Sequence, residues 1–182
     1  MVKRLATKLD GVVLLEPTVH GDERGFMVET YRRDLWAEHG VEVEFVQHNH
    51  SRSSQGTLRG LHFQTHPGQA KLLRCARGEI LDVAVDLRRD SPTYGEWEAH
   101  VLDDLKHHQL FVPVGFAHGF VVLSETADVC YLVSNLFDPA TEKGIAWDDP
   151  DVGVDWRVDE PLLSERDKTA PRLAEIADEL PW

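Results

Sequence analysis

Short runs of alternating apolar and polar residues recur along the first three-quarters of the chain. They predict strands at 11–15, 26–31, 41–51, 58–64, 70–77, 79–87, 96–103, 108–112, 118–123 and 128–136. Turn signals separate most of these runs, as at His66-Pro67-Gly68, Ser91-Pro92 and Pro113-Val114-Gly115. Many short strands separated by turns of this kind are typical of an antiparallel sandwich or barrel. We therefore expect an all-β fold.

Helical patterns are few. Residues 32–40 predict one short helix that ends at Gly40, and a second helix is expected from about Pro171 with Thr169 as its cap. After Pro139 the apolar/polar alternation is no longer regular, and we expect mostly loop with one short apolar strand. No repeat, low-complexity tract or linker divides the sequence, so we expect a single domain over residues 1–182.

One face of the strand expected at 41–51 is apolar at its start and polar further along. Val41, Val43 and Phe45 share one face, and the alternation puts Gln47 and Asn49 on that same face. Polar side chains on an inward-facing row indicate that the row ends in a cavity.

The net charge, the N-terminal sequence and the cysteines limit which partners and which compartment we expect for this protein. The chain carries a formal net charge of −13, which argues against general affinity for nucleic acid. The N-terminus has no long apolar region and no cleavage site of the signal-peptide type, and no run approaches the length that crosses a bilayer. Cys75 and Cys130 lie in apolar alternating runs and are expected to be core thiols rather than a disulfide. These features predict a cytoplasmic protein with neither a nucleic-acid nor a membrane partner.

Candidate chemistry is concentrated in residues 56–78, which contain Arg59, His62 and Lys71. His62 stands between Leu61 and Phe63, so its side chain points to the opposite face from theirs. A neutral imidazole is a natural general base near pH 7, and it works best when a carboxylate fixes its tautomer. A lone histidine on a strand is more often structural, but a base beside two cations favours a site for an anionic ligand.

Two spacings resemble the signature motifs of the cupin barrel: Gly56-x5-His62-x-Gln64, and Pro113-x-Gly115-x2-His118. Metal-binding cupins carry a second histidine where this chain has Gln64. Only His62 and His118 of that ligand set remain, whereas first-row divalent metals take three or four ligands. The cupin resemblance therefore predicts the barrel but no metal site.

Seven motifs occur in an order that resembles dTDP-4-dehydrorhamnose 3,5-epimerase and its relatives in deoxysugar biosynthesis. The resemblance runs from about residue 10 to residue 173, and its motifs are Asp22–Phe26, Gln47–Ser51, Leu58–His62, Ala76–Glu79, Ser91–Gly95, Pro113–Phe120 and Leu163–Asp167. It implies a cupin-type jelly-roll β-barrel with short flanking helices, usually a homodimer, that acts on a dTDP-sugar with no metal or organic cofactor.

The resemblance also implies residue roles. His62 would remove the proton next to a 4-keto group, with Asp167 orienting it. Lys71 would stabilise the enolate oxygen, and Tyr131 would deliver a proton to the opposite face. The substrate-binding residues would be Arg24, Arg59 and Lys168 at the diphosphate, and Phe26, Glu29, Gln47, Asn49, His118 and Glu142 along the nucleotide and sugar pocket. Taken singly, Arg24, Tyr131 and Asp167 have ordinary structural readings: a turn cation, a core tyrosine and a solvated charge.

One departure from the family pattern bears on the reaction. Many of these epimerases carry an aromatic pair, often Tyr-Tyr, before the Ser/Asp-Pro turn, whereas this chain has Leu136-Phe137-Asp138-Pro139. We therefore keep alternatives to inversion of carbons 3 and 5: a carbon-3-only monoepimerase of an antibiotic deoxysugar pathway, a ketoisomerase and a non-catalytic sugar-binding cupin.

Overall fold

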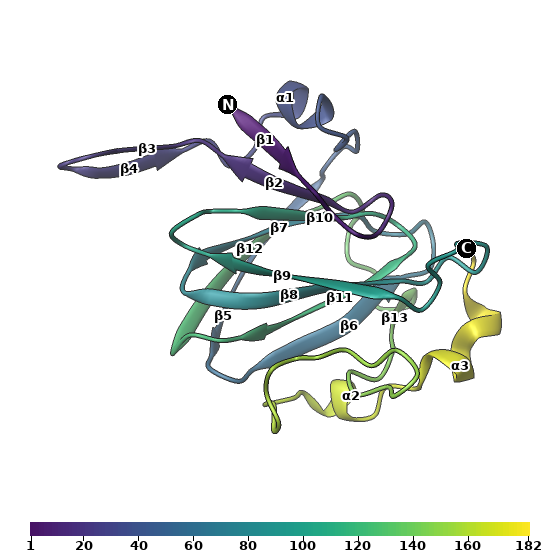
Figure 1. The fold of residues 1–182 in the computed structure, drawn as a ribbon. Coiled ribbons are helices and arrows are strands. Elements are labelled where there is room, and N and C mark those ends of the chain that lie inside the picture. Colours follow the sequence, from purple (N-terminus) through teal and green to yellow (C-terminus); the bar gives the residue numbers. More distant parts are fainter.

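The computed structural model describes residues 1–182 as two packed antiparallel sheets (Figure 1). The first sheet has the order β1 (Val2–Leu5), β2 (Val13–Pro17), β10 (Gln109–Val112), β7 (Lys71–Arg77), β12 (Thr126–Val133) and β5 (Gln47–Ser54). The second sheet has the order β13 (Glu142–Gly144), β6 (Leu58–Gln64), β11 (Phe116–Val122), β8 (Glu79–Asp86) and β9 (Trp97–Asp103). The expectation of an all-β fold is confirmed.

Apolar clusters pack on both faces of each sheet. One apolar cluster, which includes Leu73, Ile80 and Phe116, fills the space between the sheets. The outer face of the second sheet packs under the C-terminal segment, which contains α2 (Glu165–Lys168), α3 (Leu173–Ile176) and a 3₁₀ turn (Ala177–Glu179) (Figure 1). The outer face of the first sheet is covered by the segment around α1 (Arg33–Ala37), from which Trp36 packs inward. None of these short helices has the length and apolar character that crossing a bilayer requires.

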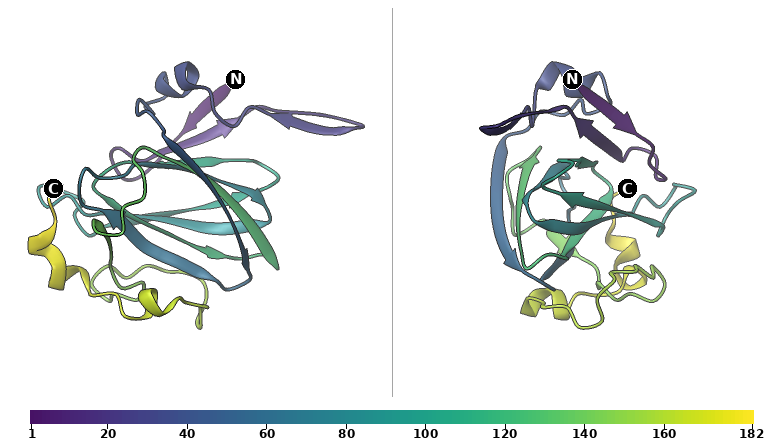
Figure 2. Two further views of the ribbon diagram at one scale, coloured as in Figure 1. Left: turned by 180° about the vertical axis from the view of Figure 1, so that it is seen from behind. Right: turned by 60° about the vertical axis from the view of Figure 1, so that its left-hand side comes forward.

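A two-stranded hairpin, β3 (Val19–Asp22) and β4 (Gly25–Val28), extends from the body of the molecule (Figures 1 and 2). It pairs with neither main sheet. Phe26 lies against His107 of the β9–β10 loop, with ring centroids 4.6 Å apart, yet it remains 61% exposed, and Met27 is 69% exposed. Both side chains are among the large apolar side chains that the fold leaves exposed.

Several predicted boundaries differ from the structure. Residues 41–46 form no strand, and Val41, Val43 and Phe45 pack on the outer face of the first sheet with α1. Thr169 does not cap the last helix: it ends α2, and Arg172 precedes α3. Cys75 and Cys130 are buried free thiols, as expected.

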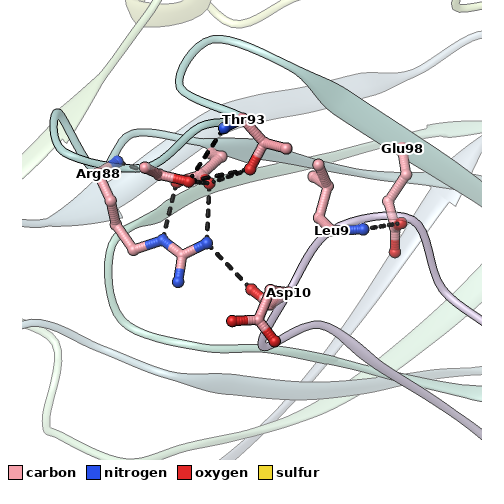
Figure 3. A network of polar contacts seen from close by, with 7 residues as sticks. Leu9, Asp10, Arg88, Thr93 and Glu98 are labelled. Atoms are coloured by element: carbon pink, nitrogen blue, oxygen red, sulfur yellow. Dashed lines mark hydrogen bonds and ion pairs between the residues drawn. The ribbon is translucent and has the colours of Figure 1, made fainter.

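The loop after β8 is held by a buried carboxylate. Asp86 accepts five hydrogen bonds, from the Arg88 backbone N–H, Arg88 Nε and Nη2, Ser91 Oγ and Thr93 Oγ1. Figure 3 shows Arg88 also reaching the backbone of Asp10, to which it donates at 3.0 Å. Burial opposes ionisation of Asp86, but the hydrogen bonds from Arg88, Ser91 and Thr93 outweigh it and hold its pKa at about 2.

We expect Asp86→Asn to lower the free energy of unfolding by about 3 kcal/mol, since it weakens hydrogen bonds made to a charged group. For a chain of this size the loss corresponds to a fall in Tm of about 6–12 °C. Because folding lowers this pKa from 3.8 to about 2, the stabilisation is present above pH 4 and disappears as the pH falls from 4 to 2. Thermal unfolding of the wild-type protein and of Asp86→Asn between pH 4 and pH 2 measures this loss of stabilisation. Asp90→Asn, an exposed carboxyl in the same loop, is the matched control and should leave Tm unchanged.

Candidate active site

A cavity of about 790 Å³ opens between the two sheets. The second sheet contributes Arg59 and His62 from β6, His118 from β11 and Glu142 from β13. The first sheet contributes Gln47 and Asn49 from β5, Lys71 from β7 and Tyr131 from β12. The segment before and within α2 adds Ser164, Arg166 and Asp167. Nine of the thirteen predicted site residues therefore line one cavity.

Close approach of β6 and β11 places two histidines opposite each other. His62 and His118 are direct partners across these strands. Gly60 has φ of +144°, and a Cβ at this position would lie 2.5 Å from the Cα of Gly119. Only glycine allows this contact, so Gly60 is required for the local geometry that carries His62 into the cavity.

A shift of register explains why Arg59 and His62 share a face. Strict alternation puts residues three positions apart on opposite faces of a strand. Here His62 pairs with His118 and Arg59 pairs with Phe120, so β6 has one more residue than β11 over the same length. The extra residue turns both side chains toward the cavity.

His62 is held by a buried carboxylate. Its Nε2 lies 2.6 Å from Oδ1 of Asp167, and Asp167 is only 4% exposed. Burial opposes ionisation of Asp167, but the hydrogen bond and the charge of His62 outweigh it and lower its pKa. Ser164 caps α2 by accepting from the Asp167 backbone N–H at 3.1 Å, which fixes the carboxylate in position. With Nε2 bound to Asp167, Nδ1 is the nitrogen left to take up a proton.

Lys71 and Tyr131 face His62 from the other sheet. Lys71 Nζ donates to the His62 carbonyl at 3.3 Å. Desolvation inside the barrel lowers the pKa of Lys71 to about 8, although Glu142 and Asp82 act in the opposite direction. Burial raises the pKa of Tyr131, so the phenol stays protonated at neutral pH. The cavity thus holds a base, a cation and a proton donor.

A second histidine–carboxylate pair lies beside the first. His118 Nε2 is 2.9 Å from Oδ1 of Asp82, which is fully buried and whose Oδ2 has no protein partner. Burial lowers the pKa of His118 despite the charge of Asp82, so the ring is neutral at pH 7. A neutral ring held in this way presents Nδ1 to the cavity as a hydrogen-bond acceptor.

The chain belongs to one known family. The family model described as dTDP-4-dehydrorhamnose 3,5-epimerase matches residues 6–175. The dTDP-4-dehydrorhamnose 3,5-epimerase of Methanothermobacter thermautotrophicus is 49% identical over 174 residues, which cover 94% of both chains. This protein is a member of the dTDP-4-dehydrorhamnose 3,5-epimerase family. The fold is accordingly the cupin-type jelly roll that the family resemblance implied.

Two further relatives of this epimerase family bear on the ligand and on the reaction. The structure of dTDP-6-deoxy-D-glucose-3,5-epimerase from Legionella pneumophila, in complex with dTDP-4-keto-L-rhamnose, superposes with a TM-score of 0.96 at 41% identity and covers 100% of this chain and 98% of its own. The dTDP-4-dehydrorhamnose 3-epimerase of Streptomyces niveus is 44% identical over 172 residues, which cover 93% of this chain and 83% of that one.

Four predicted site residues of this epimerase lie outside the cavity of their own chain. Arg24 and Phe26 are on the projecting hairpin, Glu29 follows it, and Arg24 is paired with Asp22. Lys168 points away on α2 and pairs with Glu165 at 2.6 Å. These positions correct the expectation that Arg24, Phe26, Glu29 and Lys168 line this cavity.

The sequence prediction missed one cation, Arg166. It lines the cavity and pairs with Glu142 from β13. The run Ser164–Lys168 suggested a solvated charge cluster, but it forms a one-turn helix that turns Arg166 and Asp167 toward the cavity. Ser164 three residues before an acidic residue is a capping pattern, and it was the available signal for this helix.

Gln64 stands where metal-binding cupins have a second histidine. It hydrogen bonds to the backbone at Leu136 and Asp138. The chain contains no group of three or more His, Cys, Asp or Glu side chains arranged to hold a metal ion.

Proposed function

We propose that this protein is a cofactor-independent epimerase of a dTDP-4-keto-6-deoxyhexose and that it inverts carbons 3 and 5. The observation that carries the proposal is that His62 and Tyr131 reach one cavity from opposite sheets. A sugar ring between them has a base on one face and an acid on the other. Inversion of a carbon needs this arrangement, because the proton must leave from one face and return to the other.

The reaction proceeds through an enolate. Nδ1 of His62 takes the proton from the carbon next to the 4-keto group, and the electron pair moves onto the keto oxygen. Asp167 stabilises the imidazolium that forms, since it accepts from Nε2. Lys71 stabilises the negative charge that develops on the oxygen, where a fixed cation has its greatest effect. Tyr131 then donates its proton to the same carbon from the opposite face, and solvent exchange restores His62 and Tyr131.

The nucleotide end of the ligand is proposed to lie near Arg59 and Asn49. Arg59 faces the cavity with its Nε bonded to Ser53 Oγ at 3.1 Å, which leaves the two terminal nitrogens of the guanidinium for phosphate oxygens. Arg166 is a second cation at the cavity, opposite Glu142.

We further propose a homodimer in which the hairpin of one chain completes the cavity of the other. β5 is the edge strand of the first sheet and lines the cavity with Gln47 and Asn49, so its outer edge is free to receive a strand. The hairpin projects from the body of the molecule (Figure 2). It carries an exposed phenylalanine, an exposed methionine and Arg24, none of which lines the cavity of its own chain. The dimer then supplies Arg24 and Phe26 to the partner subunit.

Mixing two inactive variants tests this arrangement. Arg24→Ala and His62→Ala chains, unfolded together and refolded at equal concentration, should regain about a quarter of wild-type activity. Half of the dimers are then mixed, and each mixed dimer has one site with both residues intact. Activity that stays at the sum of the two variants contradicts the shared site, and light scattering at a monomer mass contradicts the dimer itself.

Phe137 favours a carbon-3 epimerase as the second candidate. It lines the cavity without the hydroxyl that many family members carry at this place. Without that hydroxyl, the ring has one fewer contact to stabilise the pose needed for a second inversion.

Product analysis tests the proposal. Incubation with dTDP-4-keto-6-deoxyglucose should give a 4-keto product with inverted centres, observed by proton and carbon NMR. A 3-keto product supports a ketoisomerase instead, and an unchanged sugar that binds without turnover supports a binding protein.

A further inference from the structure

The segment between β12 and β13 forms no strand and places Phe137, which is 54% exposed, in the lining of the cavity. Its backbone is bound by the side-chain amide of Gln64. Gln64 Nε2 donates to the Leu136 carbonyl at 3.3 Å, and Gln64 Oε1 accepts from the Asp138 N–H at 3.1 Å. One amide therefore holds the backbone on both sides of Phe137.

Two more glutamines bind the same segment. Gln69 Nε2 donates to Gln64 Oε1 at 3.2 Å and to the Asn135 carbonyl at 2.8 Å. Gln47 Oε1 accepts from the Phe137 N–H at 3.4 Å. Residues 135–138 are thus fixed by side chains from β5, from β6 and from the loop before β7. We call Gln47, Gln64 and Gln69 the amide clamp.

Gln64 is the buried member of the amide clamp, with 2% of its surface exposed. A buried amide is costly unless its donors and acceptors are paired, so Gln64 is stable only while residues 136–138 keep their place. Gln64 lies two positions after His62 on β6, on the side away from Arg59. The clamp therefore adjoins the base, at the end of the cavity where the sugar reacts.

We propose that Gln64 is a positioning residue of this active site. It fixes residues 136–138 so that Phe137 forms a wall beside the reacting ring, and the place of this wall determines how readily the second carbon is presented to His62. Inversion at carbon 5 after carbon 3 requires the ring to occupy two poses against one base. The inference rests on the proposed function. It adds Gln64 as a residue that affects how readily the second carbon is inverted.

The test variant is Gln64→Glu. It keeps the size of the side chain, removes the N–H donor to the Leu136 carbonyl and places a negative charge against that oxygen. In heavy water we expect the ratio of deuterium uptake at carbons 3 and 5 to change about fivefold, the effect of one hydrogen bond. KM for the keto-sugar should rise by a similar factor while the Kd for dTDP alone is unchanged.

Protonation provides an internal rescue. As the pH falls, the introduced carboxyl takes up a proton and again becomes a donor to the Leu136 carbonyl, so the labelling ratio should return toward the wild-type value. A general loss of activity at low pH cancels in the ratio, because one base serves both carbons. A loss of folded protein lowers the labelling of both carbons alike and therefore leaves the ratio unchanged.

Gln55→Glu is the matched control. Gln55 makes the same kind of bond, from Nε2 to the Leu123 carbonyl at 2.8 Å, on an exposed loop outside the cavity. It should leave the ratio and KM unchanged. If Gln64→Glu does not fold, Gln69→Ala removes two bonds of the clamp from a half-buried position and should produce the same shift.

A folded clamp variant with the wild-type ratio and the wild-type KM overturns the inference. If the wild-type protein labels carbon 3 alone, the KM rise at constant dTDP affinity is the deciding result. If the wild-type protein introduces deuterium at neither carbon, the proposed function itself is contradicted. Failure of the inference and failure of the proposed function therefore give different results.

Discussion

Replacing His62 by alanine should lower kcat by about 10³-fold, the typical contribution of a positioned general base. That factor corresponds to about 4 kcal/mol of transition-state stabilisation. The Kd for dTDP should stay close to the wild-type value, because His62 is assigned to the sugar and not to the diphosphate. Turnover by coupled assay and dTDP binding by calorimetry measure the two effects separately.

The control for this variant is His39→Ala. His39 follows α1 and lies outside the cavity, so turnover should not change. A His62→Ala protein that keeps dTDP affinity and loses turnover excludes a non-catalytic sugar-binding module. Turnover within tenfold of wild type contradicts the assignment of His62 as the base.

Lys71→Met should lower kcat by about 10²-fold, because it removes the cation that faces the developing enolate oxygen. The wild-type protein should also show an alkaline fall in kcat/KM with a midpoint near pH 8. The pKa of Lys71 is lowered by desolvation to about 8, so the charge is present below that pH and is lost above it. Tyr131 does not produce this limb, because its pKa is raised above 10.

Lys71→Arg separates charge from geometry. The guanidinium stays charged far above pH 8, so the fall near pH 8 should disappear even if the maximal rate is lower. Lys106→Met, an exposed lysine outside the cavity, is the control and should keep both the rate and the alkaline limb. An unchanged limb near pH 8 in Lys71→Arg contradicts the assignment of this limb to Lys71.

Local patterns were sufficient to predict the all-β fold, and the family resemblance added the barrel. Strand 58–64 was predicted with its observed bounds, and Leu61 and Phe63 pack on the outer face while His62 enters the cavity. Alternation works here because one face of each strand meets the apolar core and the other meets the cavity or a cover. It does not predict the register shift that brings Arg59 and His62 to one face, since that depends on pairing with β11.

Contacts between residues that are far apart in the sequence were harder to predict. Arg166 reaches the cavity only because α2 packs near β6 and because Glu142 lies within range on β13. Arg24 and Phe26 were assigned to the pocket by resemblance, but no sequence pattern says whether a side chain acts in its own chain or in a partner subunit. The contacts of Gln64 depend on a loop more than seventy residues away, so spacing alone gave no indication of them.

The most direct test of the proposed function is an incubation with dTDP-4-keto-6-deoxyglucose in heavy water, followed by proton NMR and mass spectrometry. We expect deuterium at carbons 3 and 5, with inversion at both, because a base and an acid on opposite faces exchange the proton as they invert the carbon. Uptake at carbon 3 alone identifies the monoepimerase and directs attention to Phe137. Absence of deuterium at both carbons contradicts the account of this cavity as an epimerase site for this sugar.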